Sequence, residues 1–457
     1  MRRIVLIVIL VLAARVGVAT AQTCTPYWAS AGPMPTAAES IRAIVHDAGD
    51  GEAIYSWFST STGRVYRFRN GGWTLIAAPS INGLPNYKSI YGLNELMIEG
   101  VKSLYLYTRY SKVHTEPGLT IDHYIHQLFR WTGTTWVPAP DGLLPSRPQY
   151  PEADAEPYLS ADVGTGMTVF GRIIDRTNDR SHVGEWSPSG RWRVVGTTQA
   201  FSIGLASFDD GNGTALYAFG NMQTLNGMPV KGFAKWDGER WTFPWDEWIP
   251  SISTVWQPAV VDHGFGPLLY TNHAGGDDAG FLRRWNGDKW AIVPSLEVSQ
   301  TSLSAITQMA VFDDGRGPAL YIAGGFQRIQ GQDIVKIARY DGATWEPLGA
   351  GILWGPSYGP FHRNMVAYND PRRGPSLFVG ATHVGGGVVP RYAQWVGCPN
   401  CYADCDLDRA LTAADFVCFM SKYAALDPYA NCTVDQTIDV ADFNCFIEKY
   451  AAGCPGW

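Results

Sequence analysis

The sequence predicts an all-β protein, and three observations lead to this expectation. Aromatic residues make up 13% of the 457 residues and include 18 Trp, while Gly occurs 50 times. This composition is typical of short aromatic strands that are separated by Gly-containing turns. The third observation is a short motif, in which two aromatic residues flank such a turn, that recurs along most of the chain.

The recurring motif comes in six complete copies and one incomplete copy. In order they read RFRNGGW, FRWTGTTW, GEWSPSGRW, AKWDGERW, RRWNGDKW, ARYDGATW and YAQWVGC, and they follow one another at fairly even intervals. A second element, such as FDDGRGPALYIAGG from Phe312, precedes each copy, although its Asp-Gly turn is missing from the second unit. Asp-Gly and Asn-Gly tolerate the positive φ angles of hairpin turns. Each unit is therefore predicted to be a four-stranded sheet.

Four-stranded units of about fifty residues predict a β-propeller. Residues 23–397 number 375, which divides into seven blades of about 54 residues. The seventh unit contains Trp395 but has no second aromatic residue after it. We expect the N-terminal segment CTPYWASAG, with Trp28, to supply the missing strand. Such a seven-bladed ring, closed by the N-terminal strand, leaves no exposed sheet edge.

The repeats resemble the kelch-like propeller repeats of secreted bacterial proteins. Those repeats have the form DDGxGPALYxGGxF…IARWDGxxWxPLG, and residues 312–349 match it best. The resemblance implies the propeller fold. It does not imply a ligand, because unrelated functions use the same fold.

Two further segments flank the predicted propeller of residues 22–397. Residues 1–21 begin with Arg2 and Arg3 after Met1, continue with a short apolar run and end in Ala-Thr-Ala, a pattern typical of a secretory signal peptide. The apolar run is shorter than the ~20 residues that a membrane-spanning helix needs. We expect a secreted or cell-surface protein with no transmembrane segment in the mature chain. The composition changes near residue 398, which predicts a separate C-terminal module of residues 398–457.

Charged residues make up only 17% of the chain, with a net charge of −7. They are spread along the sequence and form no basic stripe, so we expect no nucleic-acid partner.

The eight cysteines predict disulfides, because an exported chain with an even number of cysteines commonly pairs them. One lies near the N-terminus, and the other seven lie from Cys398 onward. We expect one pair where the two chain ends meet, two pairs at equal spacing in the tail, and a fourth pair that joins the ends of the tail. They are Cys24–Cys398, Cys401–Cys454, Cys405–Cys418 and Cys432–Cys445.

The tail contains two copies of one pattern, ADCDLDRALTAADFVCF from Ala403 and ANCTVDQTIDVADFNCF from Ala430. Each copy places oxygen-bearing groups at loop positions 1, 3, 5, 7, 9 and 12, as in a calcium-binding EF-hand. In the first copy these are Asp404, Asp406, Asp408, the Ala410 carbonyl, Thr412 and Asp415. In the second they are Asn431, Thr433, Asp435, the Thr437 carbonyl, Asp439 and Asp442. A helix with Phe416, Phe419 and Met420 on one apolar face is predicted to follow the first loop.

The duplicated pattern resembles a dockerin domain, and in particular the dockerin-like tails that end in Gly-Cys, here AAGCPGW. The resemblance covers roughly residues 400–455 and implies calcium binding and a cohesin-like or cell-surface partner. Arg409 and Gln436 stand where loop position 6 usually has Gly. We expect calcium in the first loop and leave the second open. The alternative is a disulfide-linked pair of turns without metal.

The propeller itself carries no recognisable catalytic motif of the His-Glu-x-x-His, Gly-x-Ser-x-Gly or phosphate-loop type. We therefore interpret the protein as a non-catalytic binding or scaffolding propeller. The alternative is a secreted carbohydrate-active hydrolase with a propeller catalytic domain.

Aromatic residues in the loops that join strands 2 to 3, or strand 4 to the next blade, suit a glycan or peptide ligand. These two sets of loops share one face of a propeller. The alternative is that the same residues pack between blades. The candidate ligand residues are Trp245, Trp248, Trp256, Trp354, Tyr358, Arg109 and Tyr110.

Overall fold

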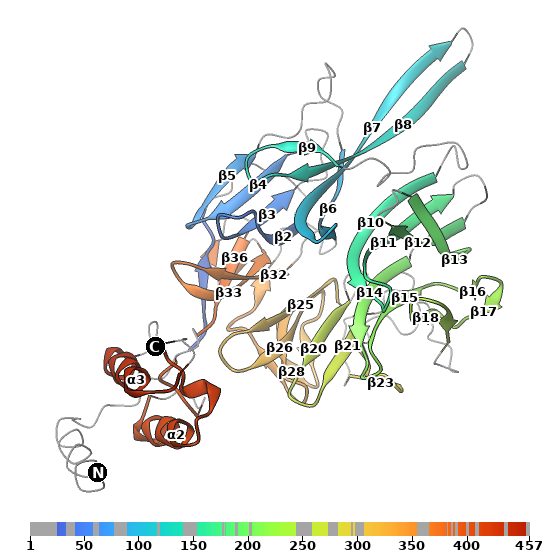
Figure 1. The fold of residues 1–457 in the computed structure, drawn as a ribbon. Coiled ribbons are helices and arrows are strands. Elements are labelled where there is room, and N and C mark those ends of the chain that lie inside the picture. Colours follow the sequence, from blue (N-terminus) through green and yellow to red (C-terminus); the bar gives the residue numbers. More distant parts are fainter. Residues whose placement is uncertain are drawn as a thin grey trace, which may run out of the picture.

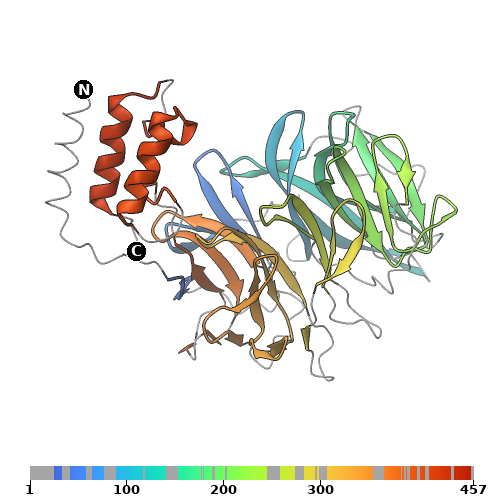
Figure 2. The ribbon, with the colours of Figure 1, turned by 90° about the horizontal axis from the view of Figure 1, so that it is seen from below.

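The computed structural model shows a ring of antiparallel sheets with a pair of helices beside it (Figures 1 and 2). It describes residues 25–32, 42–57, 64–76, 89–116, 119–139, 153–175, 178, 180–187, 191–200, 203–243, 258–272, 282–293, 296–297, 306–353, 365–381, 383–384, 387–388, 392–398, 402–406, 411–433 and 437–453. The predicted signal peptide lies outside these residues.

Seven four-stranded sheets, the blades, follow one another along the described chain. Blade 1 contains β2 (Arg42–Asp47), β3 (Glu52–Trp57), β4 (Val65–Arg69) and β5 (Gly72–Ile76). Blade 2 contains β6 (Ser89–Ile98), β7 (Val101–Glu116), β8 (Leu119–Trp131) and β9 (Trp136–Pro138). Blade 3 contains β10 (Ala153–Asp162), β11 (Met167–Asp175), β12 (Arg180–Ser187) and β13 (Arg191–Thr198). Blade 4 contains β14 (Ile203–Asp209), β15 (Thr214–Gly220), β18 (Phe233–Trp236) and β19 (Trp241–Thr242).

The remaining blades complete the ring. Blade 5 contains β20 (Ala259–Asp262), β21 (Pro267–Asn272), β22 (Leu282–Trp285) and β23 (Trp290–Ile292). Blade 6 contains β25 (Gln308–Asp313), β26 (Pro318–Ala323), β29 (Ile337–Tyr340) and β30 (Trp345–Pro347). Blade 7 contains β32 (Met365–Asp370), β33 (Gly374–Gly380), β36 (Tyr392–Val396) and β1 (Tyr27–Ser30). The predicted fold class, an all-β seven-bladed propeller with a small helical C-terminal module, is confirmed.

Short hairpins decorate the connections between strands 2 and 3 of three blades. Blade 4 has β16 (Thr224–Leu225) and β17 (Met228–Pro229), which pair only with each other. In blade 6, β27 (Arg328–Ile329) and β28 (Gln332–Asp333) are joined by β24 (Leu296–Glu297). In blade 7, β34 (His383–Val384) and β35 (Gly387–Val388) are joined by β31 (Ile352–Leu353).

The ring is closed by the N-terminal strand, as the sequence predicts. Strand β1 pairs antiparallel with β36, and Trp28 lies directly opposite Trp395. The two indole rings are 5.1 Å apart between centroids. The Trp28 Nε1–H also donates a hydrogen bond to the Leu348 carbonyl of blade 6, at 2.9 Å. The first and last parts of the propeller sequence therefore share one sheet.

The aromatic motif forms the hairpin between strands 3 and 4 of blades 1 to 6. Trp236 lies opposite Trp241, and Trp285 lies opposite Trp290. The ring centroids of these pairs are 5.3 and 5.4 Å apart. Tilted aromatic pairs at this distance add stability beyond the area that they bury. The repeated motif thus supplies a cross-strand contact within the blade.

The Asp-Gly turns between strands 1 and 2 share one hydrogen-bond pattern. Asp209 Oδ1 accepts hydrogen bonds from the amides of Gly211 and Gly213, at 2.9 and 3.1 Å. The same pattern occurs at Asp47, Asp162, Asp262 and Asp313. Blade 2 lacks this turn and uses a two-residue hairpin of Glu99 and Gly100, with φ of 53° and 75°.

Neighbouring blades approach each other closely where two kinds of turn meet. A Cβ added to Gly287, in the strand 3–4 turn of blade 5, would lie 2.7 Å from the Asp210 carbonyl oxygen in the strand 1–2 turn of blade 4. A Cβ on Gly238 of blade 4 would lie 2.6 Å from the Val163 carbonyl of blade 3. Only glycine leaves room for this contact between the blades.

Blade 2 differs from the sequence interpretation in one respect. The segment that contains Arg109 and Tyr110 was expected to be a loop, but it continues β7 and β8 as a two-stranded arm that projects from the ring (Figure 1). The pairing runs on to Glu116 opposite Leu119, whereas β6 pairs with β7 only as far as Arg109. The segment is rich in β-branched and aromatic residues, and its single Pro-Gly pair stands between the strands.

The described residues of the C-terminal module lie between 402 and 453. It contains α2 (Ala413–Ala424), the short 3-10 helix η2 (Pro428–Ala430) and α3 (Val440–Ala452). Within the described part of the chain, none of the helices combines the length and the apolar character that crossing a membrane requires.

Substituting Gly287 by Ala should destabilise the ring far more than substituting Gly264. Both residues have φ near +95°, which costs an L-residue about 1–2 kcal/mol. A Cβ at Gly264 meets nothing within 4 Å, whereas one at Gly287 meets the Asp210 carbonyl. We expect an extra loss of about 1–3 kcal/mol for Gly287→Ala, measured by denaturant unfolding. Equal losses in the two variants would contradict the close contact between blades.

Candidate metal centre and ligand face

The two copies of the tail pattern pack against each other through equivalent residues. Phe419 of α2 and Phe446 of α3 are both fully buried, and their rings stack with centroids 3.8 Å apart at an angle of 5°. The two phenylalanines occupy the same position in the two copies, each directly after the second cysteine of its copy. The core of the module is therefore a contact between two matching halves.

Two tyrosines repeat this symmetry on either side of the core. The Tyr402 hydroxyl donates to the Tyr429 carbonyl at 2.7 Å, and the Tyr429 hydroxyl donates to the Tyr402 carbonyl at 2.5 Å. Burial raises the pKa of Tyr402 to about 12, so its hydroxyl remains a donor at neutral pH. The Lys449 ammonium lies over the Tyr402 ring and the Lys422 ammonium over the Tyr429 ring, at 4.4 and 4.0 Å. Contacts in both directions tie the halves together.

In each half, a disulfide also links the start of the loop to the helix that follows it. The bonds join Cys405 to Cys418 and Cys432 to Cys445, each over 13 residues. Disulfides are typical of proteins that fold in an oxidising, extracellular setting. Cys398 is buried and disulfide-bonded. Cys24, Cys401 and Cys454 lie outside the described residues, as do the pairings predicted for them.

The first loop gathers three carboxylates. Asp404, Asp406 and Asp415 each offer an oxygen atom, and these atoms all lie within 4.8 Å of one another. Asp404 and Asp415 are buried, whereas Asp406 is exposed. Asp408 and Ala410, which the sequence adds to this site, lie outside the described residues. The three aspartates form a group that could hold a metal ion.

The start of helix α2 holds Asp415 in place. The Thr412 hydroxyl caps the helix by accepting from the Ala414 amide at 3.1 Å, and Asp415 Oδ2 accepts from the Thr412 amide at 2.8 Å. This reciprocal capping box fixes the third residue of the helix. Asp415 Oδ1 faces back into the loop and accepts from the Asp406 amide at 3.4 Å. The helix terminus and the loop thus share one carboxylate.

The second loop repeats the two main-chain hydrogen bonds to its position-12 carboxylate and adds a third bond from a side-chain hydroxyl. Asp442 Oδ1 accepts from both the amide and the hydroxyl of Thr433, at 2.9 and 2.8 Å, and Oδ2 accepts from the Asp439 amide at 2.9 Å. The hydrogen bond from the Thr433 amide, followed by that from Asp439, holds the pKa of Asp442 below its usual range. Asp439 caps α3 through the Ala441 amide. Asn431 and Thr437 occupy positions 1 and 7 of this loop, and Asp435 at position 5 lies outside the described residues.

Both oxygens of Asp442 are therefore engaged in hydrogen bonds within the second loop. Among the described residues, the grouping of three carboxylates is found in the first loop only. The chemistry of the first loop suits a hard divalent cation, because such cations prefer carboxylate oxygens as ligands.

The candidate ligand residues of the ring are largely beyond what the structure describes. Trp245, Trp248, Trp256, Trp354 and Tyr358 lie outside the described residues. Arg109 and Tyr110 lie in β7, opposite His126 and Ile125 in the strand register. The described residues therefore do not bring the sequence-predicted set together.

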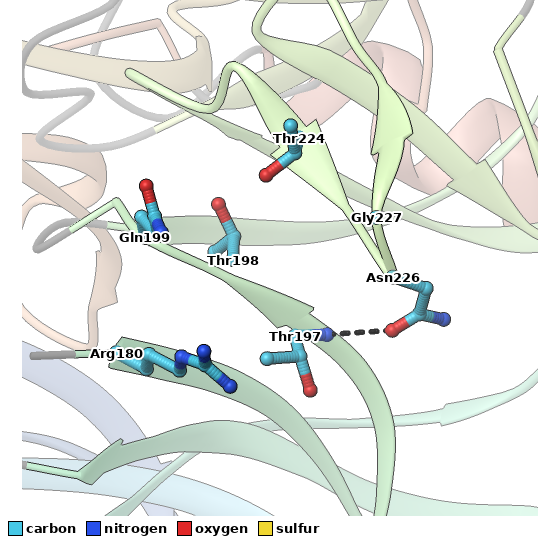
Figure 3. A pocket seen from close by; sticks show the side chains of 7 residues that line it. All are labelled: Arg180, Thr197, Thr198, Gln199, Thr224, Asn226 and Gly227. Carbon is cyan, nitrogen blue, oxygen red and sulfur yellow. Dashed lines mark hydrogen bonds between the residues drawn. The ribbon is translucent and has the colours of Figure 1, made fainter. Parts of the chain in front are cut away.

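A pocket that the sequence analysis missed lies on the face of the strand 2–3 and strand 4–1 connections (Figure 3). It has a volume of about 520 Å³ and opens at the seam between blades 3 and 4. The residues that line it are Arg180, Thr197, Thr198, Gln199, Thr224, Asn226 and Gly227. The Asn-Gly pair predicts a hairpin here, but its position against β13 depends on the packing of two blades and has no sequence signal.

Comparison with known proteins does not place the chain in a family. No family model matches the sequence, and no characterised protein matches it significantly. The BBS1N chain of a complex with ARL6DN has a TM-score of 0.44 at 8% identity, with 81% of this chain and 97% of that chain covered. The SapL1 lectin, solved with α-methyl fucoside, has a TM-score of 0.35 at 13% identity, with 78% and 97% covered. The exo-inulinase from Aspergillus awamori has a TM-score of 0.33 at 11% identity, with 82% and 96% covered.

Truncating Phe446 to Ala should destabilise the C-terminal module, because it removes half of the buried aromatic stack. Comparable core truncations cost about 3–5 kcal/mol. Val417→Ala is the matched control, since Val417 lies on α2 with 66% of its surface exposed. We expect faster amide hydrogen exchange along α2 in the first variant and little change in the second. Unchanged exchange in Phe446→Ala would mean that the disulfides alone hold the module together.

Proposed function

We propose that this protein is a secreted, non-catalytic propeller that binds or scaffolds, attached to a surface or partner by a dockerin-like module of residues 398–457. The single observation that carries the proposal is the acidic group of Asp404, Asp406 and Asp415 within a duplicated helix-loop unit. In this proposal the first loop binds calcium, and the module presents its helices to a cohesin-like or cell-surface partner.

The donor set of the first loop supports calcium. Three carboxylates within 4.8 Å repel one another, and a divalent cation between them relieves that repulsion. Calcium accepts more ligands and more irregular geometry than magnesium, which suits a loop whose ligands come from both the chain turn and the helix start. The hydrogen bond from the Thr433 hydroxyl to Asp442, which adds to the amide bond that both loops share, competes with a cation and supports weaker binding in the second loop.

Exposed apolar side chains support a docking role for the module. Leu426 and Val440 each expose 67% of their surface, and Val417 exposes 66%. These three residues lie on the surface of the module, and the stacked Phe419 and Phe446 already fill its core. A partner that covered these side chains would bury them at little further cost in folding.

The carboxylates buried in the ring support a non-catalytic role. Asp210 pairs with Lys235 at 2.5 Å and accepts from the Tyr217 hydroxyl at 2.7 Å. Asp314 pairs with Arg316 at 2.5 Å. Burial opposes the charged form of Asp314, but the Arg316 guanidinium outweighs it and the pKa of this carboxyl lies below its usual value. Acids held in this way stabilise turns and are poorly placed to exchange protons with a substrate.

The calcium site of the first loop can be tested by calorimetry on the whole protein with its disulfides intact. We expect Asp404→Asn and Asp415→Asn each to weaken the tighter site at least about tenfold, because each removes a charged ligand. Asp442→Asn should affect only the weaker site. Glu448→Gln is the charge-matched control, because this exposed residue of α3 lies outside both loops. An absence of binding heat at millimolar calcium would overturn the calcium assignment.

A further inference from the structure

The pocket between blades 3 and 4 is chemically uniform. The described residues of its lining combine one guanidinium, two side-chain amides and three hydroxyl groups, and they include neither a carboxylate nor an aromatic ring. Arg180 is exposed and forms no ion pair within the described residues. Asp175 lies opposite Arg180 in the register of β11 and β12, but its carboxylate accepts from the main-chain and side-chain amides of Asn178, at 3.1 and 2.8 Å. The pocket therefore presents an excess of hydrogen-bond donors and a positive charge.

The walls of the pocket are held in place by Asn226. Its Oδ1 accepts from the Thr197 main-chain amide at 2.8 Å (Figure 3). Its main-chain amide donates to the Thr197 carbonyl, also at 2.8 Å. Its Nδ2 donates to the Val195 carbonyl at 3.2 Å. These three bonds join the β16–β17 hairpin of blade 4 to β13 of blade 3. The pocket is thus preformed, because the hairpin on one side is tied to the strand on the other.

The same hairpin in blade 6 shows why blade 4 has space at this place. There, the linker strand β24 pairs with β27 and occupies the edge of the hairpin. Arg328 and Asp333 also form an ion pair across it, at 2.8 Å. Blade 4 has Thr224 and Pro229 at the two corresponding positions, and within the described chain β17 is the one strand that pairs with β16. The shorter Thr224 side chain leaves the space open beside a hairpin that is tied to β13 through Asn226 rather than extended by a third strand.

The hydroxyl and amide groups are placed to meet a polar ligand. Thr198 Oγ1 accepts from the Ala200 amide at 3.2 Å, which leaves its proton for a ligand acceptor. The Thr197 hydroxyl is in contact with His182 Nδ1 at 2.9 Å. Gln199 is exposed at the mouth of the pocket, and Thr224 lines the opposite wall (Figure 3). A ligand with hydroxyl groups around its edge and no large apolar part fits this lining.

We propose that this pocket binds an acidic sugar, with the ligand carboxylate on Arg180 and the ring hydroxyls on Gln199, Thr198 and Thr224. The inference deepens the proposed function, since it rests on the ring being a binding module. A planar guanidinium pairs with a carboxylate through two parallel hydrogen bonds, which gives both energy and orientation. A volume of about 520 Å³ lies within the range of small-molecule sites and is suited to one or two sugar units.

The proposal can be tested by titrating the whole protein with methyl β-D-glucuronide and, as the neutral counterpart, methyl β-D-glucoside. We expect the uronide to bind at least about tenfold more tightly, because one charged hydrogen-bonded pair is lost in the glucoside. Arg180→Gln should weaken uronide binding by a similar factor, and Arg180→Lys should weaken it less. Arg240→Gln is the control, because Arg240 is exposed and lies in a strand 3–4 turn, away from the pocket. Binding is compared only among variants whose melting temperature equals that of the unmodified protein.

The proposal would be overturned by no uronide binding, by equal binding of the two sugars, or by equal losses in Arg180→Gln and Arg240→Gln. N-acetylglutamate, which carries carboxylates without ring hydroxyls, should bind at least about tenfold more weakly than the uronide. Tighter binding of N-acetylglutamate would assign the pocket to acidic peptides and overturn the sugar assignment. Asp415→Asn should leave uronide binding unchanged. If the uronide titration fails but the calcium titration succeeds, the acidic-sugar assignment is wrong and the proposed calcium-binding module stands.

Discussion

The close approach of two turns, seen at the junctions of blades 3 and 4 and of blades 4 and 5, is the contact on which the ring depends. The strand 3–4 turn of one blade sits against the strand 1–2 turn of the blade before it, as Gly287 does against Asp210 and Gly238 against Val163. A side chain at either glycine would push neighbouring sheets apart and change the angle between them. Because the ring closes only if all junctions have the same geometry, a small error at one of them is transmitted to the others.

This constraint explains why the aromatic motif recurs with a Gly-containing turn between its two aromatic residues. The aromatic pair, such as Trp285 and Trp290, sets the hairpin, while the glycine between them sets the distance to the preceding blade. Both requirements are local in sequence, so the blades, their number and the closing strand with Trp28 could be predicted from spacing alone. The long β7–β8 arm could not, because strand continuation and a variable loop look alike until the register is known.

The sites divide in the same way. Spacing places Asp404, Asp406 and Asp415 in one loop, and the capping box at Thr412 explains why the last of them faces the other two. The internal bonding of Asp442 to Thr433 has no such sequence signal, since a hydroxyl at loop position 3 can be a ligand or a donor. The pocket at Arg180 is harder still to predict from the sequence, because its two walls belong to different blades.

In the proposed architecture, the attachment of the C-terminal module and the pocket of the ring lie on different sides of the propeller. Cys398, where the predicted module begins, donates its amide hydrogen bond to the Asp314 carbonyl, at 2.8 Å, in the strand 1–2 turn of blade 6. The chain therefore leaves the ring on the turn side, beside the blade that the N-terminal strand closes. The pocket belongs to the strand 2–3 and strand 4–1 connections, which lie on the other side. An attachment that starts from the turn side leaves the ligand face open, so holding the protein in place and binding a ligand need not compete for the same surface.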